Sequence, residues 1–305
     1  MKFGASMFFT DYSMTAQGLA RALEERGFES VWAPEHSHIP LSRKSPFVMG
    51  GELPKKYYDV MDPFVSLTAA AVATTSLKIG TGICLVNQRD PIHLAKSVAS
   101  IDQVSDGRFL FGIGNGWNQD EMENHGTNFK RRHKTVRERV EAMKQIWTQT
   151  KPEYHGEFVN FDPMMVWPKP IQKPHPPILI GGAFPYSARR AIRYGDGWMP
   201  QMTANQQTPF AELIPQFHQM ARDAGRDPET LSVSIWGRQP DYEEIAGYGE
   251  LGVERVYVGQ SIDDGDQLHG GIHVDSDGVP HCCLPVLPDI LTSGTPAQAT
   301  EVDRH

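Results

Sequence analysis

Short apolar runs alternate with longer amphipathic segments along most of this chain, and residues 78–121 show the pattern most clearly. Two apolar runs, 79–86 and 109–113, are bounded by turn residues and are too brief for helices, so we interpret both as buried strands. Between them apolar residues keep helical spacing, with Pro91 suited to the first turn and Gly107 to the end. The pattern predicts a βαβ unit with parallel strands.

The same alternation continues over the rest of the chain. Further strands are expected at residues 3–9, 30–33, 178–180, 197–199, 231–236 and 256–259. Further helices are expected at residues 19–27, 62–73, 136–147, 187–194, 210–224 and 242–251. About eight alternations of strand and helix predict an α/β fold of the TIM, or (β/α)₈, barrel type. A doubly wound open sheet is the alternative.

Three segments depart from this regular pattern. Residues 37–60 form a polar insertion after the second strand, and connections of this length are often lids or binding loops. Residues 154–166 indicate a hairpin. After residue 259 an eighth helix should follow, but the sequence QSIDDGDQLHGG has turn residues and no apolar face. We therefore expect a barrel domain at residues 1–259 and an atypical tail at 260–305, irregular or disordered.

Composition narrows the class of protein. A chain of 305 residues fits one barrel or two smaller domains, and a formal charge of -8 argues against a general nucleic-acid binder. No stretch approaches the length of a membrane span, and the N-terminus lacks a signal core. We expect a cytoplasmic protein with neither a membrane nor a nucleic-acid partner. The 3 cysteines lack metal-ligand spacing, so free thiols and no metal site are expected.

Glycines mark the carboxyl ends of the two strands in the βαβ unit predicted within residues 78–121. Parallel barrels bind their ligands at these strand ends. Gly82 closes one strand, and Gly112, Gly114 and Gly116 punctuate the next. Glycines there let the backbone approach a flat or charged ligand, although tight turns alone would also explain them. A dinucleotide fingerprint is disfavoured, because GIGNGW lacks the GxGxxG spacing and no clear helix opens directly after it.

Five segments in this order carry a family resemblance: APEH at 33–36, GTGI at 80–83, DGRFLFGIGNGW at 106–117, PKPIQKPHPPILIGG at 168–182 and YGDGW at 194–198. Through them the chain resembles the luciferase-like monooxygenase superfamily. Within it, the chain is similar to the bacterial oxidoreductases that use the deazaflavin coenzyme F420. Members that use FMN share most of the same segments.

The resemblance implies a flavin-type ring lying across the strand ends. It places His36, preceded by the acidic Glu35, beside the reactive ring atom, where an imidazole can give or take a proton. The alternative is a histidine that binds a loop carbonyl. Gly82 and Ile83 match the place where relatives bend the third strand behind the ring, often through a non-prolyl cis peptide, and a β-bulge is the alternative.

The resemblance also implies polar contacts to the coenzyme. Asn115 matches a residue that bonds the ring edge or the ribityl chain, and Asp120 is a further candidate from the same loop. Gly181 and Gly182, ahead of a helix, match the phosphate site, where free N–H groups attract an anion. Arg132, in the basic run 130–133, could meet the phosphate and polyglutamate tail or lie on a solvated face.

Trp117 stands where several sugar-phosphate-oxidising relatives carry a glutamate proton donor. The same reaction is therefore not expected, and Trp117 either walls the substrate pocket or is a packed loop aromatic.

The leading functional hypothesis is hydride transfer between F420 and a small organic substrate, in a homodimer as in many relatives. An FMN-dependent monooxygenase supplied with reduced flavin by a partner reductase is the second, and a non-catalytic flavin-binding protein is another. A metal hydrolase, suggested by His36 and His38, needs an acid on the last strand, and residues 257–259 offer none.

Overall fold

The computed structural model describes residues 1–201, 208–237 and 247–259, together with the short strands 261–263, 267–269, 272–274 and 280–282. Residues 242–246 of the helix expected at 242–251 lie outside these ranges, and residues 247–250 are helical. Everything below refers to the described residues.

Eight parallel strands close into a barrel. They are β1 (Lys2–Ser6), β2 (Ser30–Ala33), β3 (Lys78–Thr81), β5 (Phe109–Gly114), β8 (Ile178–Gly182), β9 (Gly197–Pro200), β10 (Ser232–Gly237) and β11 (Arg255–Gly259). Each pairs in parallel with its neighbours, and the ring closes because β11 pairs with both β10 and β1. Closure confirms the predicted TIM barrel and excludes the open sheet.

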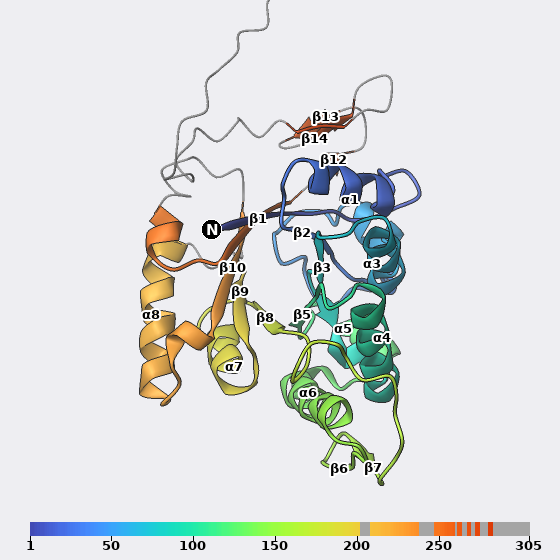
Figure 1. The fold of residues 1–305 in the computed structure, drawn as a ribbon. Coiled ribbons are helices and arrows are strands. Elements are labelled where there is room, and N and C mark those ends of the chain that lie inside the picture. The colour runs from blue at the N-terminus through green and yellow to red at the C-terminus, as the bar shows by residue number, and fades with distance from the viewer. Residues whose placement is uncertain are drawn as a thin grey trace, which may run out of the picture.

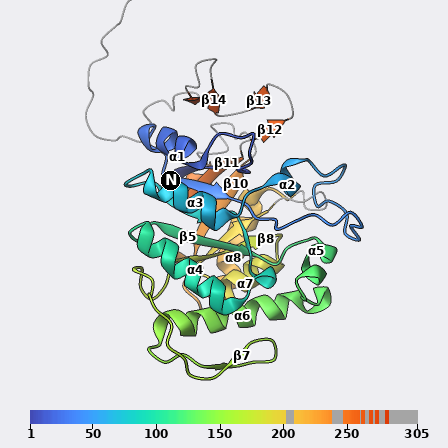
Figure 2. The ribbon, with the colours of Figure 1, turned by 90° about the vertical axis from the view of Figure 1, so that its right-hand side faces the viewer.

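Helices connect the strands and cover the outside of the barrel, as Figures 1 and 2 show from two directions. The long ones are α1 (Ala16–Glu25), α3 (Pro63–Val72), α4 (Pro91–Val104), α6 (Arg132–Thr148), α7 (Tyr186–Tyr194) and α8 (Phe210–Asp223). Asp62 and Asp90 cap α3 and α4, each accepting two backbone N–H bonds just ahead of a proline in the first turn.

Shorter elements lie between these helices. They are α2 (Lys56–Asp59), α5 (Gln119–Asn124), and the 3₁₀ turns η1 (Val86–Gln88), η2 (Phe129–Arg131) and η3 (Pro228–Thr230). A β6–β7 hairpin (Tyr154–His155, Asn160–Phe161) confirms the prediction for residues 154–166.

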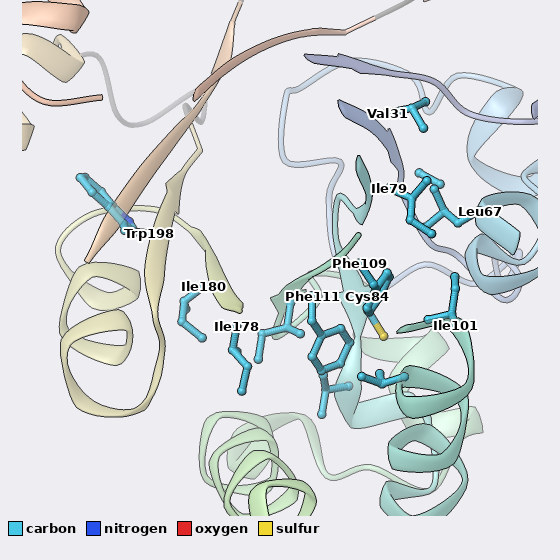
Figure 3. Packing of buried hydrophobic residues seen from close by; sticks show 14 of the residues in the cluster. Val31, Leu67, Ile79, Cys84, Ile101, Phe109, Phe111, Ile178, Ile180 and Trp198 are labelled. Atoms are coloured by element: carbon cyan, nitrogen blue, oxygen red, sulfur yellow. The ribbon is translucent and has the colours of Figure 1, made fainter. Parts of the chain in front are cut away.

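The main core lies between the barrel wall and the helices. Figure 3 shows Ile79 of β3 and Leu67 of α3 facing each other, with Phe109 of β5 next to them, and all three are buried. Burial of this apolar surface stabilises the barrel and leaves its carboxyl-terminal mouth free for polar groups.

A second, aromatic cluster fills the inside of the barrel. Trp32 and Tyr257 stack with ring centroids 5.1 Å apart, and Trp236 meets Tyr257 edge-on at 5.0 Å. A β-carbon on Gly80 would lie 2.5 Å from the Trp32 ring, so this glycine makes room for the indole. The cluster forms the floor under the mouth of the barrel.

The strand predicted at residues 79–86 is two pieces, which corrects the sequence interpretation. β3 ends at Thr81, the Gly82–Ile83 peptide bond is cis, and β4 (Cys84–Leu85) resumes the pairing with β5 before η1 begins. A hydrophobic run cannot reveal such a break, because both pieces are buried. The bend that the resemblance placed at Gly82 is confirmed.

An ion pair fastens the last strand of the barrel. Arg255, with 1 % of its surface exposed, donates two bonds of 2.6 Å to the carboxylate of Glu29, just before β2. Burial alone would raise the pKa of Glu29, but the bonds from Arg255 and Ser30 lower it to about 2. This bidentate pair joins the two sides of the closing seam.

Within the predicted tail, four short strands are described, and they form two antiparallel pairs. β12 (Ser261–Asp263) pairs antiparallel with β13 (Gln267–His269), and β14 (Ile272–Val274) with β15 (Pro280–Cys282). None of the described helices is both long and apolar enough to cross a membrane.

Candidate active site

A cavity of about 600 Å³ opens at the carboxyl ends of the strands. It is lined by all the residues predicted for the site except Asp120, namely Glu35, His36, Gly82, Ile83, Asn115, Trp117, Arg132, Gly181 and Gly182. The strand order therefore brings together positions that are up to about half the chain apart in sequence.

His36 is held by a carboxylate that the sequence interpretation missed. Its Nδ1 lies 2.8 Å from Oε2 of Glu121, whose other oxygen accepts a 3.0 Å bond from the Ser37 N–H. The Glu121 side chain is 1 % exposed; burial alone would raise its pKa, but the bonds from His36 and Ser37 keep it below its ordinary value. The negative charge fixes the ring and leaves Nε2 as the nitrogen available for proton exchange.

Nothing in the local sequence distinguishes Glu121 from its acidic neighbours. Asp120, Glu121 and Glu123 all belong to the charged helix α5, which follows the Gly-rich loop. Only the packing of α5 against the loop after β2 selects Glu121 as the partner of His36. The sequence interpretation expected no helix at this point.

Both carboxylate oxygens of Glu35, which lines the cavity, accept hydrogen bonds from neighbouring residues. It accepts a 2.6 Å bond from the Leu85 N–H and a 2.5 Å bond from Arg89 Nε. Arg89 also binds Asp62 at the start of α3. Glu35 therefore ties the segment after the cis peptide to two neighbouring elements, which suits a positioning residue, and its catalytic role stays a prediction.

Ile83 lies in a cradle made by two glycines. A β-carbon on Gly114 would overlap its Cδ1 atom, and one on Gly181 would lie 2.9 Å from its Cγ2 atom. Gly114 was predicted to let the backbone approach a ligand, and Gly181 to belong to the phosphate site. Both also make room for the side chain that follows the bend, and the cradle holds the Gly82–Ile83 peptide against the cavity.

Two buried oxygen atoms at the cavity have no hydrogen-bond partner among the described residues. They are Oδ1 of Asn115, on the Gly-rich loop, and Oγ of Ser6, at the end of β1. Buried polar atoms are nearly always bonded, so each indicates a group that a ligand would satisfy. Asn115 thus fits its predicted role, whereas Ser6 was missed.

One end of the cavity is cationic. Arg132, His133 and Arg190 line it beside Gly181 and Gly182, and the buried Nε atoms of both arginines lack a hydrogen-bond partner among the described residues. No ion pair to a described carboxylate involves either arginine. Burial lowers the pKa of both, and Arg190 lowers that of Arg132 further. Unpaired cations beside a helix start suit an anion such as a phosphate.

The turn before α7 is fixed by its own bonds. Ser187 Oγ donates a 2.6 Å bond to the Gly182 carbonyl and accepts a 2.9 Å bond from Trp198 Nε1. Gly182 has φ +131°, in a region that other residues rarely adopt. Of the predicted basic run, Arg131 pairs with Glu157 instead of facing the cavity.

The opposite end is apolar and is built largely by the insertion. Trp117 meets His36 edge-on at 5.9 Å between ring centroids, and Phe47 contacts both Trp117 and Tyr57. Phe8, Val48, Met49 and Tyr57 complete this wall. The prediction that the insertion and Trp117 shape a pocket fits this arrangement.

Asp120 fastens the insertion and does not reach the cavity. Its carboxylate accepts a bond from the Lys44 N–H and pairs with Lys44 Nζ at 3.2 Å, while Nζ also pairs with Glu123 at 2.6 Å. Ser45 Oγ accepts a 3.1 Å bond from the Gln119 N–H. We call these contacts between residues 44–45 and α5 the clasp.

The two histidines that suggested a metal site diverge. His36 faces the cavity, whereas the His38 ring lies 2.9 Å from Ser37 Oγ on one side and 2.9 Å from Asn124 Nδ2 on the other. No group of three or more His, Cys, Asp or Glu side chains among the described residues could hold a metal ion.

Comparison with known proteins identifies relatives over most of the chain. The family model described as luciferase-like monooxygenase matches residues 11–239. A protein of Mycobacterium tuberculosis of uncharacterised function is 38% identical over 277 residues, covering 87% of this chain and 94% of the relative. The F420-dependent hydroxymycolic acid dehydrogenase of the same species is 29% identical over 215 residues, covering 70% of this chain and 55% of the enzyme.

Among solved structures, a monooxygenase from Streptomyces bottropensis superposes with a TM-score of 0.64 and 26% sequence identity. The match covers 83% of this chain and 77% of that one.

Proposed function

Because the chain belongs to the luciferase-like monooxygenase family, we propose that its cavity binds the deazaflavin coenzyme F420 and that the protein transfers hydride between it and a small organic substrate. The observation that carries the proposal is the division of the cavity. Its lining combines a cationic group, a bent strand beside an unpartnered amide oxygen, and an apolar group around a histidine.

These three regions match the parts of such a coenzyme. Arg132 and Arg190, with the turn before α7, would bind the phosphate, and Asn115 Oδ1 would accept a bond from the polar edge of the ring. The Gly82–Ile83 peptide would support the face of the ring, held in place by its glycine cradle. Bound there, F420 would supply a ring carbon that accepts or gives hydride.

The protein's part in the reaction is proton traffic and orientation. His36 would take or give a proton at Nε2, because Glu121 holds Nδ1 and stabilises the charged ring when it forms. The 7 % exposure of the His36 side chain limits competition from bulk water. Glu35 supports this arrangement indirectly, through Leu85 and Arg89.

An F420-dependent relative supports the choice of coenzyme. The hydroxymycolic acid dehydrogenase shares 29% identity over 70% of this chain. The FMN-dependent monooxygenase is the second candidate, favoured by the solved monooxygenase at 26% identity. Both candidates place a phosphate at the cationic end.

Direct titration tests the proposal. Coenzyme-free protein is titrated with F420 and with FMN, followed by fluorescence, and the loaded protein is then assayed for F420 reduction and for oxygen consumption. We expect F420 to bind at least about tenfold more tightly, a difference of about 1.4 kcal/mol, and no oxygen consumption. Tighter FMN binding with oxygen consumption in the presence of reduced FMN would establish the second candidate, and failure to bind either coenzyme would overturn both.

A further inference from the structure

We propose that Tyr57 binds the oxygen of the substrate beside His36, and that the substrate is an uncharged apolar alcohol or ketone. The inference rests on the proposed hydride transfer and extends it to a residue of the insertion and to a substrate class.

The Tyr57 ring is held in place by its neighbours. It lies on α2 at the end of the insertion, with its centroid 4.7 Å from that of Phe8, 5.1 Å from Phe47 and 5.4 Å from His36. Tyr57 and His36 both line the cavity, and the Tyr57 hydroxyl makes no hydrogen bond to any described residue. A phenol held beside the active imidazole in the cavity wall is placed to donate a hydrogen bond to a ligand oxygen.

The hydroxyl stays a donor over the neutral range. Burial raises the pKa of Tyr57 to about 12, so the phenol keeps its proton. It can donate to a carbonyl oxygen, or to an alkoxide as that oxygen gains negative charge, while His36 handles the transferred proton.

The surrounding wall indicates what the rest of the substrate is like. Phe8, Val48, Met49 and Trp117 present apolar or aromatic surface. Lys56 also lines the cavity, but its Nζ lies over the Phe8 ring, 5.4 Å from the centroid, so an aromatic face already engages its charge. The carboxylate of Glu35 is occupied by Arg89 and Leu85. An uncharged, apolar molecule fits this wall best.

The coenzyme, His36 and Tyr57 together account for every bond and proton in the reaction. In the oxidising direction the carbinol C–H bond breaks and its hydride passes to the coenzyme. The hydroxyl proton goes to His36 Nε2, a C=O bond forms, and Tyr57 keeps its proton while donating a hydrogen bond to that oxygen. Reduction of the ketone is the reverse.

A matched pair of variants tests the proposal. Tyr57→Phe keeps the ring and its packing and removes only the hydroxyl, and Tyr58→Phe makes the same change on an adjacent ring that is 53% exposed. With F420-loaded protein and a series of 2-alkanols of increasing length, we expect kcat/KM to fall by about 10- to 100-fold in Tyr57→Phe alone. The Kd for F420 should not change. Wild-type kcat/KM should rise with chain length and exceed that for hydroxy acids.

A second readout needs no turnover. Carbonyl-labelled acetophenone is bound to the coenzyme-free protein, and its C=O stretching frequency is measured by infrared spectroscopy. A hydrogen bond from Tyr57 lowers this frequency, so we expect the lowering in wild type and Tyr58→Phe and its loss in Tyr57→Phe.

The outcomes separate the two proposals. A Tyr57-dependent shift without hydride transfer to F420 would support the binding role and count against the proposed coenzyme chemistry. Turnover and carbonyl frequency that are equal in Tyr57→Phe and wild type would overturn the role of Tyr57. A preference for hydroxy acids over 2-alkanols would overturn the substrate class.

Discussion

The Cδ1 atom of Ile83 fills the space that a side chain on Gly114 would need. Gly114 is the last residue of β5, and Ile83 lies between β3 and β4, which both pair with β5. Their fit holds the peptide of residues 82 and 83 at the cavity wall. Gly114 belongs to a glycine pattern that resembles a ligand-binding loop, but its direct effect is to make room for Ile83. It supports a ligand only through the position of the neighbouring peptide.

Replacing Gly114 by alanine should displace Ile83 into the cavity. We expect F420 affinity to fall at least about tenfold and the free energy of unfolding to fall by about 1 to 3 kcal/mol, the usual cost of overpacking. Fluorescence titration and chemical denaturation measure the two effects. Gly249→Ala is the control, since a β-carbon there meets nothing within 4 Å. Unchanged affinity in Gly114→Ala would contradict the supporting role of the bend.

Replacing Glu121 by glutamine should slow the reaction without weakening coenzyme binding. The amide keeps the shape of the side chain but removes the charge that stabilises a protonated His36, so we expect kcat to fall about 10- to 100-fold. Steady-state kinetics and F420 titration separate the two quantities. Glu212→Gln, an exposed change on α8, should leave both unchanged. A kcat equal to that of wild type would rule out the His36–Glu121 pair as the proton-handling unit.

Replacing Arg190 by methionine should weaken coenzyme binding. Its Nε is buried without a hydrogen-bond partner among the described residues, and it lies at the cationic end of the cavity. Loss of one charge-assisted bond should raise the Kd for F420 about 10- to 100-fold. Arg189→Met, on the exposed side of the same helix, is the control. If both variants bind F420 equally well, the phosphate lies elsewhere.

Coenzyme affinity should depend on pH through His133. Burial, together with Arg132 and Arg190, lowers the pKa of His133 to about 4, so its ring is neutral at pH 7 in the free protein. A bound phosphodiester favours the protonated ring and raises that pKa. The complex then holds more protons than the free protein, so affinity should rise as pH falls from 7 to 5. Calorimetry in buffers of different ionisation enthalpy detects the proton uptake, which His133→Gln should abolish and His93→Gln should not.

Breaking the clasp should weaken substrate binding and leave coenzyme binding unchanged. Lys44→Met removes the ion pairs to Asp120 and Glu123, which hold the insertion on α5. We expect KM for an apolar substrate to rise about three- to tenfold with little change in the Kd for F420, because each exposed ion pair contributes only about 0.2 to 1 kcal/mol. Lys151→Met, an exposed change elsewhere, is the control. A rise in the Kd for F420 without a rise in KM would show that the clasp serves the coenzyme end.

The barrel could be predicted well from the sequence because its strands and helices leave periodic patterns of apolar residues. Alternating apolar runs, proline at helix starts and glycine at helix ends report local geometry, so α4 and β5 appear close to where they were expected. The family resemblance added His36, Asn115 and Gly181, which all line the cavity.

What the sequence did not predict depends on contacts between distant segments. Glu121 lies 85 positions from His36, and the two residues meet only because α5 packs against the loop after β2. Glu35 and Asp120 have the right chemistry for a site, but each carboxylate is occupied, by Arg89 and by Lys44 respectively. Tyr57 reaches the cavity only because the insertion folds back over it, and insertions carry little periodic signal.

One short helix serves both the proposed catalytic histidine and the first part of the insertion. α5 orients His36 through Glu121 and, on its neighbouring residues, fastens Lys44. A protein engineer who grafts a new segment in place of residues 37–60 to change selectivity would therefore need to transplant α5 with it. Evolutionary substitutions in residues 37–60 should likewise be accompanied by compensating substitutions in α5.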